Sequence, residues 1–158
     1  MIFATCGTSH FRFDRMMEAL AVLPDGELCV QHGPATPPSG AEAYPFLAFT
    51  ELVAKIEAAD IVVTHAGVGS VLCAIRAGHT PIIFPRLRRY SEVVDDHQAE
   101  LAVALAERGT AIVAQTPGEL ADAVRSVPER HTNARSDARS LVDAIRVTIV
   151  GSVLEPVG

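Results

Sequence analysis

Basic side chains are scarce in this sequence. Thirteen lysines and arginines stand against 19 aspartates and glutamates, so the formal net charge is −6. Proteins that bind nucleic acid without sequence preference obtain most of their affinity from basic side chains on phosphates. We therefore expect no nucleic-acid partner.

Cysteine is also rare and poorly placed for cross-linking. Cys6, Cys29 and Cys73 are odd in number, widely spaced and without a C-x-x-C pair, and the six histidines show no metal-ligand spacing. This pattern argues against a disulfide framework and against a zinc site. We expect free thiols in a reducing compartment and no metal.

Long apolar runs are missing as well. No stretch approaches the roughly 20 apolar residues that cross a bilayer, and the start of the chain, residues 1–6, is too short and lacks the basic flank of a signal peptide. We expect a cytoplasmic protein that meets a membrane only peripherally, through a partner.

What the sequence does contain is a regular alternation of short apolar runs and helical periodicities over 158 residues, enough for a single domain, 1–158. This alternation predicts an α/β fold, a Rossmann-like doubly wound parallel sheet. The expected strands are residues 1–6, 28–31, 61–64, 81–85 and 111–114, with a short strand at 46–49. The expected helices are 11–23, 49–56 from an N-cap at Thr50, 70–77 from an N-cap at Ser70, one around 101–105, 116–124 and 136–150, the last packing back across the sheet. The proline-rich residues 34–45 predict an irregular surface loop.

The segment from His65 to Ser70 follows the apolar run 61–63 and precedes a helix. Gly67 and Gly69 allow a ligand to approach the backbone, Ser70 suits a helix cap, and a helix start binds phosphate through its free N–H groups. An ordinary tight strand-to-helix turn would have the same sequence, so this reading stays open on these residues alone.

Polar clusters follow three expected strands, at 7–10, 65–70 and 86–98. In open α/β sheets ligands gather beyond the carboxyl ends of the strands. A dinucleotide fingerprint, a Walker phosphate loop and a G-x-S-x-G elbow are all absent. The sequence therefore predicts a phosphate-bearing ligand held without an obvious metal.

Four patches together resemble a known family. They are Gly7-Thr8 with Phe13-Asp14-Arg15, Gln31-x-Gly33, the segment from Ala59 to Gly78, and Pro85-Arg86 running to Asp95-Asp96-His97-Gln98-x-Glu100-Leu101. The chain resembles the C-terminal, donor-binding domain of family-28 glycosyltransferases, which have the GT-B fold. More narrowly it is similar to the small catalytic subunit of two-part exopolysaccharide or capsule enzymes, and more distantly to the catalytic subunit of the dolichol-diphosphate N-acetylglucosaminyltransferase.

The resemblance implies a site residue by residue. The donor diphosphate would be bound by His65, Gly67, Gly69 and Ser70. The donor sugar would be held by Asp96 and Gln98, and Gly7, Thr8 and Ser9 would line the cleft. The donor is expected to be a UDP-sugar, used as substrate without a metal or other cofactor. One position departs from the family, because Cys73 stands where relatives often place a glutamate that binds the ribose hydroxyls.

The same resemblance implies a hexosyltransferase that is active only with a partner. In such enzymes the acceptor half usually supplies or positions the general base, so we expect a membrane-associated subunit that binds a lipid-diphosphate acceptor for polysaccharide synthesis. His10 is a weak candidate base, and a surface histidine is an equal alternative. A free half-cleft also favours self-association when the partner is missing.

Several readings stay open beside these. Asp95 and Asp96 also suit the first turn of a helix, and capping or packing accounts for His97 equally well. Arg86, Arg88 and Arg89 with Tyr90 form a basic patch in the sequence that would suit anionic groups or a solvated loop. The whole chain would also suit a non-catalytic donor-domain-like subunit or, less readily, a stand-alone nucleotide-sugar hydrolase or epimerase.

Overall fold

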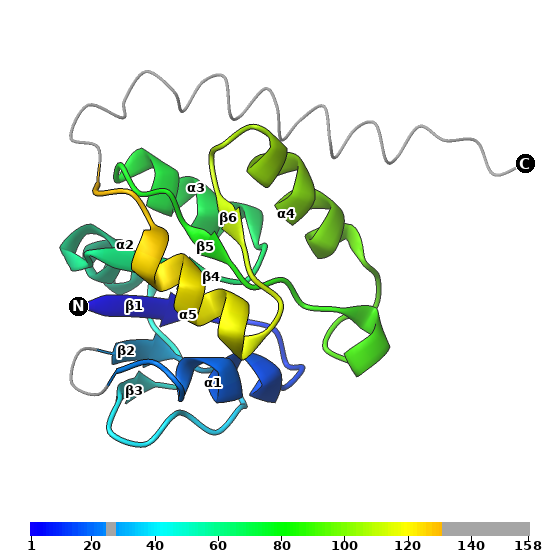
Figure 1. The fold of residues 1–158 in the computed structure, drawn as a ribbon. Coiled ribbons are helices and arrows are strands. Elements are labelled where there is room, and N and C mark those ends of the chain that lie inside the picture. Colours follow the sequence, from blue (N-terminus) through cyan, green and yellow to red (C-terminus); the bar gives the residue numbers. More distant parts are fainter. Residues whose placement is uncertain (25–27, 131–158) are drawn as a thin grey trace, which may run out of the picture.

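The computed structural model describes residues 1–24 and 28–130, and these form one parallel sheet covered by helices on both faces (Figure 1). The six strands are β1 (Ile2–Thr5), β2 (Leu28–Gln31), β3 (Glu42–Tyr44), β4 (Ile61–Thr64), β5 (Ile82–Ile83) and β6 (Ile112–Val113). The expected α/β class and parallel sheet are confirmed. The C-terminal helix expected at 136–150 lies outside the described residues.

The strand order is β3-β2-β1-β4-β5-β6, with every neighbouring pair parallel. The chain builds outward from β1 to β3 and then returns to place β4 on the other side of β1. This reversal makes the β1–β4 boundary the topological switch point, where open α/β sheets bind their ligands. The register pairs Thr5 with Thr64 at this boundary, so the turns that follow the two strands start side by side.

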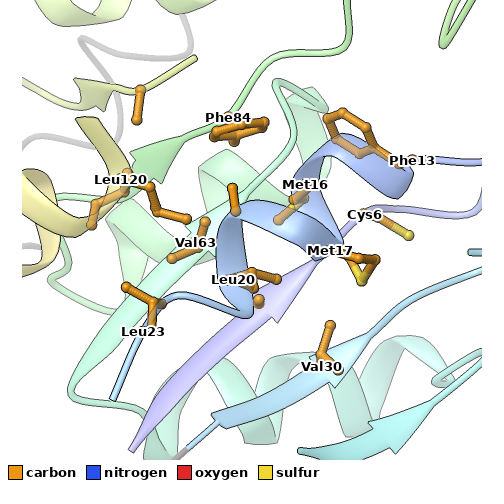
Figure 2. Close-up of a cluster of buried hydrophobic side chains, with 14 of the residues drawn as sticks. Cys6, Phe13, Met16, Met17, Leu20, Leu23, Val30, Val63, Phe84 and Leu120 are labelled. Carbon is orange, nitrogen blue, oxygen red and sulfur yellow. The ribbon is translucent and has the colours of Figure 1, made fainter. Parts of the chain in front are cut away.

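Both faces of the sheet are apolar, as parallel sheets covered by helices require. On one face α1 (Asp14–Leu20) and α5 (Pro117–Ser126) pack over Ala4, Val30 and Val63, and Figure 2 shows Met16, Leu20 and Leu120 around Val63 on this face. On the other face α2 (Phe49–Ala58), α3 (Val68–Arg76) and α4 (His97–Glu107) cover Phe3, Val62 and Ile83. Alternate strand residues thus supply the apolar cores on both faces.

Two helix ends have the residue types that are typical of those positions. Thr116 caps α5 by accepting a hydrogen bond from the Glu119 N–H at 3.2 Å, and Pro117 occupies the first turn. Gly78 follows the C-cap of α3 with φ +91°, the left-handed conformation that favours glycine there.

Three local predictions are wrong. Helix α2 begins after Ala48, whose N–H is bound by the Glu51 carboxylate at 2.8 Å, so Thr50 lies inside the helix. The extra strand is residues 42–44, within the stretch expected to be an irregular loop, and residues 46–48 form no strand. Pairing with β2 orders 42–44 as an edge strand despite the flanking prolines, because prolines outside the paired residues cost no ladder hydrogen bond.

Candidate functional site

A cavity of about 290 Å³ opens at the β1–β4 switch point. Its lining comes from the turns after β1 and β4, the end of β2 and the segment that enters α2. The lining residues are Thr5, Gly7, Thr8, Gln31, Phe46, Leu47, Phe49, Leu52, His65, Gly67, Gly69 and Ser70. These described lining residues include no aspartate, glutamate, lysine or arginine.

The polar floor of the cavity is held in place by side chains from three neighbouring strands. The Thr5 hydroxyl donates to Gln31 Oε1 at 2.8 Å and accepts from the Gly7 N–H at 3.2 Å. Thr64 and Ser70 share a buried hydroxyl–hydroxyl hydrogen bond of 2.7 Å. Buried hydrogen bonds of this kind hold a site rigid before a ligand arrives.

Helix α3 begins at the cavity, after the N-cap residue Gly67. Ser70 is therefore not the cap that the sequence predicted. It lies in the first turn, and its hydroxyl donates to the Gly67 carbonyl at 3.0 Å. The first turn contains no acidic residue, and its N–H groups have no helical carbonyl four residues before them to bind. The helix start thus offers an anion both N–H donors and the positive end of the helix dipole.

His65 lies between two glycines, one from each side of the switch point. A Cβ at Gly7 would come within 2.4 Å of His65 Cε1, and a Cβ at Gly67 would come within 2.2 Å of His65 Nε2. Both distances are shorter than two non-bonded heavy atoms can approach. The two glycines are therefore required by the imidazole between them, and Gly7 also has φ +76°.

The imidazole of His65 is neutral at physiological pH. Burial, reinforced by the charge of Arg86, lowers its pKa from 6.5 to about 4. Its Nδ1 is buried and has no hydrogen-bond partner among the described residues. A neutral ring beside two glycine backbones is able to donate one N–H to an anion in the cavity.

One wall of the cavity is apolar, and the sequence interpretation missed it. Phe46 and Phe49 are 63% and 67% exposed, and with Leu47 and Leu52 they face the polar floor. Large apolar side chains exposed next to a polar cavity are typical of a ligand site. Two phenylalanines beside a proline-rich stretch were the available signal, but the sequence pattern favours a strand at Phe46 and a helix start at Phe49.

The predicted site residues divide into two groups. The lining contains His65, Gly67, Gly69 and Ser70, the predicted phosphate contacts, and also Gly7 and Thr8. Ser9, His10, Asp96 and Gln98 are not among the lining residues. His10 is exposed and stacks on Phe11, with 4.3 Å between ring centroids.

Asp96 and Gln98 lie at the start of α4, where both bind backbone N–H groups. Asp96 Oδ1 accepts from the Arg88 N–H at 3.0 Å, and Gln98 Oε1 accepts from the Arg86 N–H at 3.3 Å. Asp96 is the N-cap residue of α4, but its side chain makes no capping hydrogen bond. The two side chains therefore fasten α4 to the segment that follows β5.

The neighbouring Asp95 and His97 form an exposed pair. Asp95 Oδ1 lies 3.0 Å from His97 Nδ1 and accepts from the His97 N–H at 3.2 Å. This carboxylate raises the pKa of His97, and the imidazole lowers the pKa of Asp95. The pair is a local helix-start interaction.

Arg86 does not belong to a surface patch, which corrects the sequence interpretation. Its side chain is fully buried, whereas Arg88, Arg89 and Tyr90 form an exposed 3₁₀ turn, η1 (Arg88–Tyr90). Arg15 joins Arg86 on the inner side of this turn. It donates to both Glu92 carboxylate oxygens at 3.0 and 2.8 Å.

Cys73, the expected counterpart of a ribose-binding glutamate, is half-buried in the packing between α3 and α2. It is not among the residues that line the cavity, and burial raises the pKa of its thiol. A ribose in the cavity would therefore receive no carboxylate from this position.

Two kinds of feature are absent from the described residues. Within residues 1–24 and 28–130, no three histidine, cysteine, aspartate or glutamate side chains cluster as metal ligands do. The helices of this same part of the chain are all too short or too polar to cross a membrane.

Comparison with known proteins decides the family. The model of the glycosyltransferase family 28 C-terminal domain matches residues 1–146. The chain belongs to this family. A segment of 52 residues is 38% identical to the UDP-N-acetylglucosamine transferase subunit ALG13 of Yarrowia lipolytica, covering 33% of this chain and 24% of that protein.

Solved structures show the same fold. This family 28 chain is similar to the glycosyltransferase of kitacinnamycin, with a TM-score of 0.60 and 22% identity over 99% of this chain and 44% of that one. It is also similar to the calicheamicin glycosyltransferase CalG4, with a TM-score of 0.57 and 19% identity over 96% of this chain and 39% of that one. A third similar structure is MurG of Acinetobacter baumannii, with a TM-score of 0.55 and 21% identity over 97% of this chain and 48% of that one. The chain thus spans less than half the length of each of these proteins, and it has the fold of one domain of GT-B glycosyltransferases.

Proposed function

We propose that this family 28 domain binds a nucleoside-diphosphate sugar, most simply a UDP-sugar, and is the donor half of a sugar-transferring enzyme. The observation that supports this most directly is the cavity at the switch point. There the start of α3 and His65, between its two glycines, face an apolar wall. A nucleoside-diphosphate sugar combines a charged diphosphate with a flat, partly apolar base.

Each part of the cavity suits one part of such a donor. The N–H groups at the start of α3 and the neutral His65 ring suit the diphosphate. Phe46 and Phe49 offer exposed rings against which a base can stack. The volume of about 290 Å³ is at the lower end of small-molecule sites, which suits a site closed by a second wall.

The sugar would extend from the diphosphate toward α4, where we place it near Asp96 and Gln98. These two side chains now bind backbone N–H groups of 86–88, and each retains acceptor or donor capacity for a hydroxyl. During transfer, negative charge grows on the departing diphosphate. Fixed N–H dipoles at α3 would stabilise that charge without a proton transfer.

We further propose that a partner supplies the acceptor half, as a membrane-associated subunit that holds a lipid-diphosphate acceptor. This chain spans less than half of each similar glycosyltransferase structure, and the Yarrowia relative is itself a subunit. The described lining residues include no carboxylate, and the His65 ring lies between two glycine backbones. A general base would then come from the partner.

Isothermal titration with UDP and with UDP-N-acetylglucosamine tests the donor site. We expect both to bind, and we expect Gly67→Ala to weaken both because the new methyl group displaces His65. Gly118→Ala is the matched control, because a Cβ there meets nothing within 4 Å and Gly118 lies in α5, away from the cavity. Equal effects of the two substitutions, or no binding of UDP or any nucleotide sugar to the wild type, would exclude this donor site.

A second candidate is a non-catalytic subunit that binds the donor and only stabilises its partner. Cys73 in place of the ribose acid is the observation in its favour. The two candidates differ in a reconstituted two-subunit complex. Full transfer activity after Asp96 and Gln98 are both changed to alanine would favour the non-catalytic role, and its loss with UDP binding retained would favour the catalytic one.

A further inference from the structure

The cavity presents a charge problem that the proposed function leaves unsolved. A nucleoside diphosphate carries at least two negative charges, the whole chain carries a formal −6, and the described lining residues contain no cationic side chain. His65 is neutral at physiological pH. Helix dipoles alone stabilise an anion modestly, so a full positive charge near the cavity would matter.

Arg86 lies directly behind the cavity floor. Its Nη2 donates to the Cys6 carbonyl at 3.0 Å, and Cys6 immediately precedes the lining residue Gly7. Its Nη1 donates to the carbonyls of Phe11 and Glu92, each at 3.1 Å. The guanidinium therefore sits among carbonyl oxygens at the end of β1, and it is close enough to His65 to act on that ring electrostatically.

The surroundings of Arg86 leave its charge only partly compensated. Among the described residues, Glu92 lies beside Arg86, and the Glu92 carboxylate is bound to Arg15 through both oxygens. Glu92 also accepts from the Leu87 N–H at 3.0 Å. Two arginines and one glutamate leave this group of three, of which Arg86 and Glu92 are buried, with one net positive charge, because guanidinium groups stay protonated in proteins.

The guanidinium of Arg86 is buried and poorly solvated. Arg86 is 1% exposed, its guanidinium lies 4.4 Å from the Phe13 ring centroid, and its Nε has no hydrogen-bond partner in the part of the chain that the structure describes. Burying a guanidinium is costly, and burial lowers the pKa of Arg86. A field from a buried charge is screened less by solvent and salt than one from a surface charge.

We propose that the charge of Arg86 supplies the positive potential that makes the site selective for a diphosphate. The field of this charge acts on the cavity across the backbone of the turn after β1. This inference rests on the proposed function and names the charge that favours a diphosphate in the cavity. Arg86 does not touch the ligand in this account, so it is a specificity-determining residue and not a phosphate contact. Arg15 and Glu92 set how much of its charge remains.

Charge-changing variants separate this role from a merely structural one. The measurement is the affinity for UDP and for uridine, which lacks the phosphates. We expect Arg86→Met to weaken UDP binding on the order of tenfold and to leave uridine binding unchanged, as removal of one nearby charge should. Arg86→Lys should keep most of the UDP affinity. Glu92→Gln should strengthen UDP binding, because it leaves two positive charges uncompensated.

The sign of the Glu92→Gln effect is the deciding result. If Arg86, Arg15 and Glu92 had only a structural role, Glu92→Gln would weaken UDP and uridine binding alike, and that result would overturn the inference. Equal losses of UDP and uridine affinity in Arg86→Met would also overturn it. Asp122→Asn is the control, since Asp122 is exposed and pairs with Arg125 on α5. If Arg86→Met does not fold, Arg86→Lys and Glu92→Gln still decide.

The pKa of His65 gives a second measurement that needs no ligand. Burial is the largest cause of its low value, followed by the charge of Arg86, with the Thr5 backbone acting in the opposite direction. By NMR titration, Arg86→Met should raise this pKa from about 4 and Glu92→Gln should lower it. An unmoved pKa refutes the inference whatever UDP does. Shifts as expected in a protein that binds no UDP would refute the proposed function alone.

Discussion

Replacing Gly67 by alanine should destabilise the protein through one contact, that with His65. The backbone of Gly67 has φ −76° and ψ 123°, which any residue adopts, so an alanine adds no backbone strain. The added Cβ would lie 2.2 Å from His65 Nε2, and ordinary contact begins near 3.4 Å. The ring must therefore move by roughly 1 Å, toward Gly7, where its Cε1 edge already excludes a Cβ.

The cost follows from overpacking. Forcing an extra methyl group into a tight site typically costs about 1–3 kcal/mol, and we expect Gly67→Ala to lower the free energy of unfolding by about 2 kcal/mol. In a His65→Ala background the obstacle is gone. There the same substitution should be neutral, or stabilising by about 0.5 kcal/mol, because alanine restricts the unfolded chain more than glycine does.

Urea denaturation of the wild type, the two single variants and the double variant gives this coupling directly, as a double-mutant cycle. Gly69→Ala is the matched control, since a Cβ there meets nothing within 4 Å and alanine favours a helix by about 1 kcal/mol over glycine. The reasoning fails if Gly67→Ala costs the same with and without His65.

Three further predictions concern pH, the apolar wall and a helix cap. The pKa of His65 is about 4 in the folded protein and near 6.5 in the unfolded chain, so the unfolded state takes up the proton first and stability should fall between pH 6.5 and 4, by up to about 3 kcal/mol. His65→Gln should flatten this part of the pH profile of urea unfolding; an unchanged profile would contradict the lowered pKa. Phe46→Ala with Phe49→Ala should weaken UDP and uridine binding by a similar factor in calorimetry, whereas Val22→Ala, at another exposed apolar side chain, should change neither; a loss confined to UDP would exclude stacking on the base. Thr116→Ala should cost about 1 kcal/mol of stability in thermal unfolding by removing the cap of α5, and Thr36→Ala, at an exposed loop residue, should cost far less; equal costs would show that the cap is not formed in solution.

Five of the six strands and the turn at 65–70 were predictable from sequence because both depend on local patterns. The run 61–63 is apolar because both sheet faces are covered, and Gly67 and Gly69 precede a helix, so strand, turn and helix follow in order. The place of this turn beside Gly7 follows from the strand order, which the alternation of strands and helices does not specify by itself.

The remaining features depend on contacts between distant segments. The need for Gly67 arises from His65, whose ring is held against Gly7, some 60 residues away in the sequence. The burial of Arg86 depends on carbonyls of the turn after β1. In sequence, Arg86 stands near two exposed arginines, so nothing local distinguishes a buried charge from a surface one.

The central claim is that the cavity between β1 and β4 binds a nucleoside diphosphate. An NMR titration of ¹⁵N-labelled protein with UDP tests it most directly. We expect the largest amide shifts at Gly7, Gly67, Gly69 and Ser70, with smaller shifts along 46–52. Saturable shifts centred on other residues, or none at millimolar UDP, would contradict the account.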